Sequence, residues 1–247
     1  MSWRLNAGLL LATLSAATTA NGQAGGFLIQ GRVTVVGRTP PSRSKDNSSV
    51  VVWLKLLDDS MRTSAAPVSY NRSARLQLVQ KGKRFEPHLL IVPVGSTVDF
   101  PNHDPFFHNV FSLFEGKRFD LGLYESGATR SVRFDRLGIC YIFCNIHAEM
   151  SAVVLVVNTP YFAISDRQGE IRIPNVPPGR YLLKVWDERS LPRLLDGLTR
   201  EVTISQDSMS LGDIRVDEKG FVQAPHKNLY GQDYVPPAPQ GSVYDHR

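Results

Sequence analysis

The chain has 247 residues, of which 42% are hydrophobic and 21% charged, and its formal net charge is +5. This length is sufficient for one large or two small domains with cores of their own. The Lys and Arg residues are spread along the sequence without basic runs, which argues against nucleic-acid binding. No Cys-x-x-Cys-His is present, which excludes covalently attached c-type haem.

The N-terminal residues have the layout of a bacterial export signal. Arg4 precedes an apolar run of small residues over 7–17, followed by Ala20-Asn21-Gly22-Gln23-Ala24. A disordered N-terminal tail is the alternative. We expect residues 1–24 to be removed on export, leaving a protein in the periplasm or released from the cell. No later stretch approaches the length of a transmembrane helix.

The rest of the sequence predicts an all-β protein. Residues 27–36 and 50–54 read as strands, within a first segment of 27–57. Residues 58–73 have no periodicity and read as a connection, and 116–127 as a long excursion. Further strands are expected at 76–79, 89–92, 97–100, 110–114, 130–134, 139–143 and 151–157. Many short strands with Gly and Pro punctuation are typical of β-sandwiches.

The stretch from Gly138 to Met150 carries the clearest chemistry. It begins as a strand with Cys140, Ile142 and Cys144 on one face, and ends in a loop that holds Cys144, His147 and Met150. A thiolate, imidazoles and a weak thioether are the donors of an electron-transfer copper site. A second imidazole is needed, and His108 is the candidate.

These residues resemble those of the cupredoxins. Cys144-x-x-His147-x-x-Met150 has the ligand-loop spacing of amicyanin, His108-Asn109-Val110 is similar to the His-Asn-Val/Ile of amicyanin and plastocyanin, and residues 92–100 look like the strand pair before the first ligand. The resemblance covers 75–157. It implies a Greek-key β-sandwich with one copper ion bound by His108, Cys144, His147 and Met150. It also implies that Asn109 hydrogen-bonds across to the ligand loop, and the alternative is an Asn that only stabilises a turn.

Cys140 is expected to be a buried thiol rather than half of a disulfide. Four residues along a strand separate Cα atoms by about 13 Å, whereas a disulfide tolerates about 7 Å. A binuclear copper centre with two cysteines four apart is an alternative, but its spacing from the second Cys to the His is one residue longer than here.

Two roles are possible for the apolar residues that flank the predicted ligands. Phe106, Phe107, Ile146 and Ala148 form either an apolar mouth for electron transfer or part of the core. His88 and His103 match no role in the cupredoxin pattern and are expected to be structural.

Residues 160–216 have a separate signature. Asp166-x-x-Gly169 and Pro177-Pro178-Gly179 predict turns between alternating strands. This pattern resembles the second half of the carboxypeptidase regulatory-like, prealbumin-type β-sandwich, whose first half is similar to 27–57. We therefore hypothesise that the cupredoxin is inserted into a split sandwich. In that case 29–36 or 50–54 pair with strands between 164 and 186.

From residue 217 to 247 the sequence predicts a weakly ordered tail. His226 and His246 lie there and are expected to be solvated.

Together these patterns predict a periplasmic type 1 (blue) copper protein that transfers single electrons and is not an enzyme. With six histidines, two of them in the tail, the chain lacks the residues for further copper centres. The expected partner is a redox protein, a cytochrome c or a dehydrogenase. The alternative is a non-redox copper-holding or envelope interaction module that uses the prealbumin-like domain. The sequence also resembles methylamine-utilisation-like bacterial proteins, which does not establish methylamine as a substrate.

Overall fold

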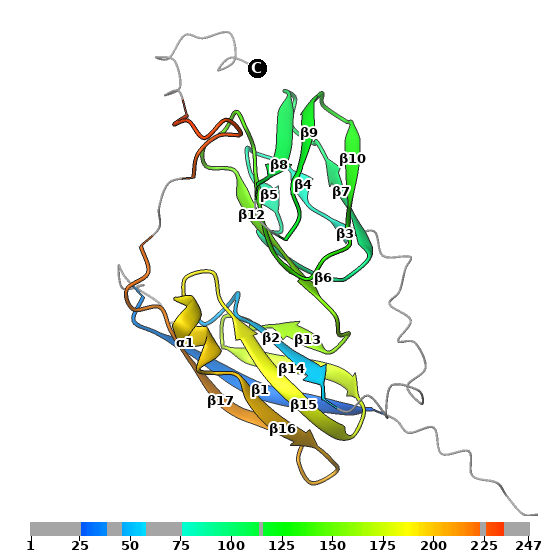
Figure 1. Cartoon of the computed structure of the whole chain (residues 1–247), viewed down its shortest axis with the longest axis vertical. Helices are drawn as coiled ribbons and strands as arrows, with labels where there is room; N and C mark the ends of the chain where they lie inside the picture. Colours follow the sequence, from blue (N-terminus) through cyan, green and yellow to red (C-terminus); the bar gives the residue numbers. More distant parts are fainter. Residues whose placement is uncertain (1–25, 39–45, 58–75, 114–115, 223–225, 235–247) are drawn as a thin grey trace, which may run out of the picture.

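The chain folds into two β-sandwiches (Figure 1). The computed structural model describes residues 26–38, 46–57, 76–113, 116–222 and 226–234. The predicted export signal lies outside these residues. Within the described part of the chain, no helix is long and apolar enough to cross a membrane. The predicted all-β class is confirmed.

The first sandwich is built from residues 76–157 and contains two sheets and a short hairpin. One sheet has the order β10-β7-β3, the other the order β6-β12-β11-β8-β9, and β4 pairs with β5. The strands are β3 (Leu76–Gln77), β4 (Val79–Gln80), β5 (Phe85–Glu86), β6 (Leu89–Pro93), β7 (Ser96–Pro101), β8 (His108–Ser112), β9 (Phe119–Tyr124), β10 (Thr129–Phe134), β11 (Gly138–Phe143) and β12 (Ser151–Val157). Residues 119–124, expected in an excursion, instead form an edge strand against β8.

The core of the first sandwich follows the predicted alternation of β11. Cys140 and Ile142 are buried between the sheets together with Phe100 and Phe134 from the opposite sheet. Ile139 and Tyr141 point the other way. Both cysteines are free thiols, as their spacing predicts.

The second sandwich combines the N-terminal strands with strands that follow the first sandwich. Its sheets have the orders β14-β1-β17 and β13-β2-β15-β16. The elements are β1 (Phe27–Val36), β2 (Val51–Leu56), β13 (Phe162–Ile164), β14 (Glu170–Val176), β15 (Gly179–Trp186), α1 (Pro192–Asp196), β16 (Arg200–Ile204) and β17 (Ser210–Asp217).

The N-terminal strands pair as the split-sandwich hypothesis requires. Gly31 in β1 lies opposite Ile171 in β14, and Leu54 in β2 lies opposite Leu183 in β15. The first sandwich is therefore inserted between β2 and β13 of the second. Membership of the second sandwich in the prealbumin class stays a prediction.

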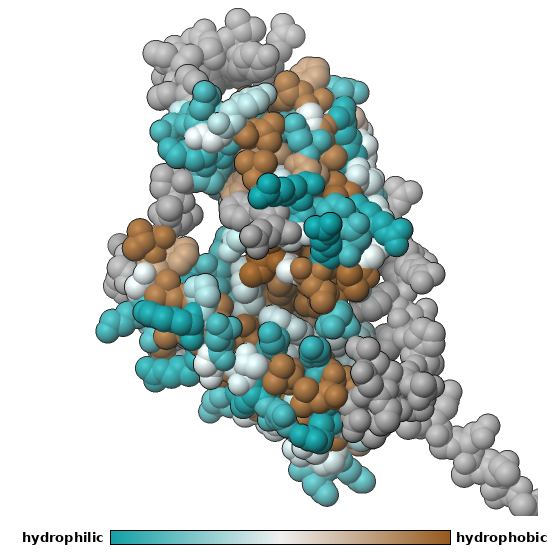
Figure 2. Space-filling model, in the orientation of Figure 1, coloured by the Kyte–Doolittle hydropathy of each residue, from teal (hydrophilic) through white to brown (hydrophobic). Residues whose placement is uncertain are grey.

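Strand β12 is buried on both faces. Val154 and Val156 belong to the core of the first sandwich, whereas Val153, Leu155 and Val157 join the core of the second. This double burial explains why the strand reads as a continuous apolar run rather than an alternating one. In the view of Figure 2, apolar side chains gather around the junction of the two sandwiches.

His88 also joins the two sandwiches. Its Nδ1 lies 3.0 Å from the Ser151 carbonyl oxygen at the start of β12, and its Nε2 lies 2.6 Å from Glu188, just beyond β15. The hydrogen bond with Glu188 raises the pKa of His88, so the imidazolium that donates to both oxygens is favoured.

An ion-pair network holds the second sandwich together where β17 ends. Glu218 is 3% exposed and accepts hydrogen bonds from Arg38 at 2.7 and 2.9 Å and from Arg189 at 3.1 Å. Asp187 is also buried beside this network, where it accepts hydrogen bonds from Ser190 Oγ and the Arg189 N–H. Burial, together with the charge of Glu218, raises the pKa of Asp187 to about 6.

Asp187 should therefore make the protein less stable as pH rises from about 4 to 6. In this window the unfolded chain loses the Asp187 proton while the folded chain retains it, so deprotonation favours unfolding. We expect Asp187→Asn, which cannot ionise, to gain about 2–3 kcal/mol relative to the native protein between pH 4 and pH 7. Urea unfolding across this range measures the difference, and Asp207→Asn, at an exposed turn, is the control. A difference that does not depend on pH would contradict the expectation.

Candidate metal centre

The loop before β8 is fixed by the side chain of Asn102, and this sets the position of His108. Asn102 is fully buried. Its Nδ2 donates to the Phe106 carbonyl oxygen at 2.8 Å, and its Oδ1 accepts the Asp104 N–H at 3.0 Å. The loop therefore delivers Asp104 and His108 to one side of the sandwich in a defined geometry.

Asp104 holds the His108 ring in a single orientation. The carboxylate Oδ2 lies 2.8 Å from His108 Nε2, and both residues are buried. The same carboxylate accepts the backbone N–H groups of Gly82 at 2.6 Å and Lys83 at 2.9 Å. Burial favours the neutral form of Asp104, but these N–H groups and His108 outweigh it and lower the pKa. Asp104 is thus an anion that accepts a hydrogen bond from His108 Nε2–H. This leaves the lone pair of His108 Nδ1 available to bind a metal.

The second and third donors come from the loop between β11 and β12. Cys144 directly follows β11, and its N–H donates to the Met150 carbonyl oxygen at 3.2 Å, while the Met150 N–H donates to the His147 carbonyl oxygen at 3.1 Å. These two bonds close a tight loop that turns Cys144 and His147 toward the same point.

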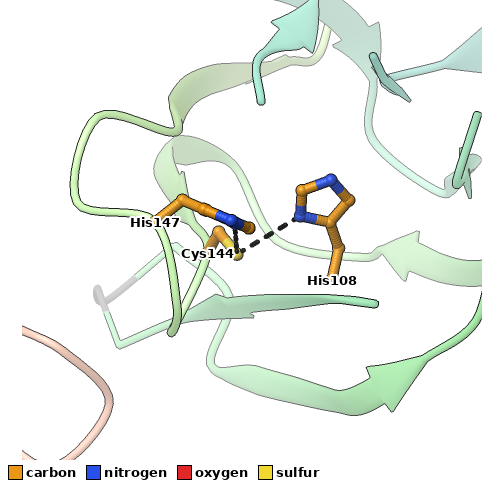
Figure 3. Close-up of side chains that lie close together, drawn as sticks. All are labelled: His108, Cys144 and His147. Carbon is orange, nitrogen blue, oxygen red and sulfur yellow. Dashed lines mark hydrogen bonds between the residues drawn. The ribbon is translucent and has the colours of Figure 1, made fainter. Parts of the chain in front are cut away.

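The three side chains meet around the Cys144 sulfur (Figure 3). Sγ lies 3.7 Å from His108 Nδ1 and 3.6 Å from His147 Nδ1. All three donor atoms lie within 4.8 Å of one another, and this is the one group of three or more His, Cys, Asp or Glu among the described residues that could hold a metal ion. Cys144 and His108 are fully buried.

The environment of His108 and His147 favours the neutral form of both imidazoles. Burial lowers the pKa of His108, against the opposing effect of Asp104. Burial, His108 and Lys83 together lower the pKa of His147 to about 4. At neutral pH each imidazole therefore keeps a lone pair available for a cation.

The surroundings of Cys144 favour the thiolate only when a bound cation neutralises its charge. Burial raises the pKa of the Cys144 thiol, whereas the backbone N–H groups of Asn109, Ile146 and His147, which hydrogen-bond to it, lower it. The pocket thus penalises an isolated thiolate, yet presents N–H groups to one whose charge is neutralised by a bound metal. The donor set fits a soft or borderline cation such as copper.

Asn109 hydrogen-bonds to Cys144 through its backbone, whereas its side chain has another partner. Its N–H hydrogen-bonds to Cys144, but its side-chain Nδ2 donates to Asp120 Oδ1 on β9 at 2.7 Å. The amide side chain therefore fastens β8 to its neighbouring strand and does not reach across to the ligand loop.

Met150 is fully buried in the same core cluster as Cys144. Its backbone closes the loop, and its thioether as an axial ligand stays a prediction. His103 is exposed, and His88 lies between the sandwiches.

Phe106 packs over the imidazoles, whereas other flanking residues face solvent. Its ring centroid lies 5.2 Å from that of His108 and 5.7 Å from that of His147. Phe107 and Ile146 are 50% and 48% exposed, and Ala148 is exposed. These three residues therefore belong to the surface and not to the core.

Sequence reasoning missed Asp104. Its position four residues before His108, in the loop that precedes the ligand, was the available signal, but a carboxylate in a Pro-containing loop is ordinarily solvated. The contact depends on a loop fold that the local pattern does not reveal.

No family model and no curated protein matches the chain. Solved structures match about a third of it. They include the copper-containing nitrite reductase from Thermus scotoductus SA-01 (24% identity, 34% of this chain and 23% of that one, TM-score 0.33). A purple cupredoxin from Nitrosopumilus maritimus also matches, with 24% identity over 33% of this chain and 99% of that one and a TM-score of 0.30. A point mutant of amicyanin in its oxidised state matches with 22% identity over 34% of this chain and 84% of that one, with a TM-score of 0.33. The chain thus spans less than a quarter of the nitrite reductase.

Asp104→Asn should weaken metal binding. The neutral amide has one acceptor oxygen and so cannot serve all three of the His108, Gly82 and Lys83 N–H donors. His108 therefore loses part of its fixed orientation and basicity, and we expect a loss of about 10–100-fold in copper affinity. Chelator competition measures this loss, and thermal unfolding of the metal-free protein separates it from a general loss of stability. Asp99→Asn, which affects a partly exposed carboxylate that bonds Ser131 on the surface, is the control. Equal affinities for Asp104→Asn and the control would refute this role.

Proposed function

We propose that this chain is a type 1 copper protein of the cupredoxin class that carries single electrons. The observation that carries the proposal is the convergence of Cys144 Sγ with the Nδ1 atoms of His108 and His147 in a buried pocket. Met150, buried in the adjoining core, would complete the ligand set. Copper, when bound, supplies one-electron chemistry between Cu(I) and Cu(II).

The protein's contribution is to hold the donors so that they need not move. Asp104 fixes one imidazole, and the Cys144–Met150 and Met150–His147 backbone bonds fix the loop. Phe106 packs against both rings. Such a pre-organised set serves both oxidation states with little rearrangement.

An electron carrier fits these residues better than an enzyme. Two of the three converging donors are fully buried, and a substrate would have to displace one of them or Met150. The additional histidine clusters that a multicopper enzyme needs do not occur among the described residues. We place the protein in the periplasm on the strength of the predicted export signal in residues 1–24.

The visible spectrum tests this function. The copper-loaded protein should show an intense band when oxidised that a mild reductant bleaches reversibly. Cys144→Ser should abolish the band because it removes the thiolate. Cys140→Ser should retain it, because Cys140 is buried in the core on β11 but lies outside the donor cluster. Copper bound only as Cu(I), with no reversible band, would favour a copper-holding role instead.

We further propose that a redox partner docks beside His147. Ile146 adjoins His147 in the sequence and Phe107 adjoins His108, and both are large apolar residues that are half exposed. An apolar contact there would bring a partner close to the metal. Two copies of the protein can exchange electrons through the same surface.

Ile146→Lys should therefore slow electron self-exchange roughly tenfold, because two like charges would face each other in the encounter. NMR line broadening of mixed oxidation states measures the rate. Leu28→Lys adds the same charge at an exposed position of β1 in the second sandwich and should leave the rate nearly unchanged. Equal slowing in both variants would show that net charge, rather than this surface, controls the reaction.

A further inference from the structure

Residues 226–234, here called the C-terminal strap, contact three consecutive residues at the start of the metal-binding loop. The His226 ring stacks on Phe143, with centroids 4.2 Å apart and an angle of 29° between planes. Tyr234 Oη donates to the Cys144 carbonyl oxygen at 2.7 Å. The Leu229 N–H donates to Asn145 Oδ1 at 2.8 Å. These residues of the predicted weakly ordered tail thus have defined partners.

The strap has internal structure of its own. Asn228 Oδ1 accepts the N–H groups of Tyr230 and Gln232, each at 2.9 Å, and the Asn228 N–H donates to the Gln232 carbonyl oxygen at 2.9 Å. The resulting turn brings the two ends together, so that Tyr234 Oη lies 3.2 Å from His226 Nδ1. His226 and Tyr234 therefore meet the loop as a pair.

In Figure 1 residues 226–234 lie beside the loop before β12 of the first sandwich.

The Cys144 carbonyl that accepts the Tyr234 hydrogen bond lies just past the end of the β11–β12 ladder. It lies beyond Phe143–Ser151, the last pair of the β11–β12 ladder. It belongs to the peptide unit that joins Cys144 to Asn145, and the next two N–H groups, of Ile146 and His147, hydrogen-bond to Cys144. The orientation of this peptide therefore governs how well those N–H groups point at the sulfur.

We propose that Tyr234 is a positioning residue for the metal-binding loop, holding the Cys144–Asn145 peptide so that the loop's N–H groups and the Cys144 sulfur keep their geometry. The carbonyl can only accept, so the tyrosine hydroxyl donates to it. The His226 Nδ1–H donates to the hydroxyl oxygen in the tautomer that completes the chain. This inference rests on the proposed function for its consequence at the metal, but not for its effect on the loop.

The test compares Tyr234→Phe with Tyr230→Phe in the full chain. Tyr230 lies in the same strap but is 74% exposed, so its hydroxyl should not matter. In the metal-free protein, Tyr234→Phe should speed amide hydrogen exchange in residues 144–150 by about two- to tenfold, the effect of one lost hydrogen bond. Copper affinity, measured by chelator competition, should fall by a similar factor, and the visible band should shift. Tyr230→Phe should match the native protein in all three measurements.

The possible results separate the two proposals. Loop exchange that is equal in Tyr234→Phe and the native protein would overturn the role of Tyr234, whatever the metal does. A native protein without a visible band would overturn the blue-copper function, while faster exchange in Tyr234→Phe would still support the positioning role. Unchanged thermal unfolding of the metal-free variant would confirm that the effect is local to the loop.

Discussion

The placement of β8 beside β11 is the constraint on which the candidate site depends. Phe143 pairs with Phe111 across these strands, which brings the start of β8 next to the end of β11. His108 begins one strand and Cys144 follows the other, so a histidine 36 residues away reaches within 3.7 Å of the thiol. The short loop after β11 is then enough to bring His147 to the same point. Any shift in this strand pairing would separate the donors, because neither segment holds all three.

Burial controls the chemistry once the donors have met. The same exclusion of water that raises the pKa of Cys144 lowers the pKa of both histidines. The pocket thus disfavours charge on each donor taken alone, and a bound cation relieves that cost for the thiolate without competing with protonated imidazoles. Asp104 adds a fixed negative charge, and it lies on the far side of the His108 ring from the sulfur.

The sequence predicted what depends on local pattern and spacing. The all-β class, the opposite faces of β11 and the grouping of His108, Cys144 and His147 follow from alternation and ligand spacing. What it missed depends on tertiary contacts. The edge strand over 119–124 alternates apolar residues with Asp120 and Gly122, but the glycines at 116, 122 and 127 favour a loop. Asp104 contacts His108 because hydrogen bonds from Asn102 fix the loop between them. The contact of the strap with Cys144 joins residues 90 positions apart, and no sequence motif predicts it.

The second sandwich has a physical relationship to the metal-binding loop that its sequence alone would not reveal. Strand β12 follows the loop directly, and its outward residues Val153, Leu155 and Val157 are buried in the core of the second sandwich. The strap reaches the other end of the loop, at Cys144. The loop is therefore held at its exit by a strand shared between two cores and at its entrance by the strap. Loosening the second sandwich would relax the restraint on β12, so this domain is coupled to the metal-binding loop through the shared strand.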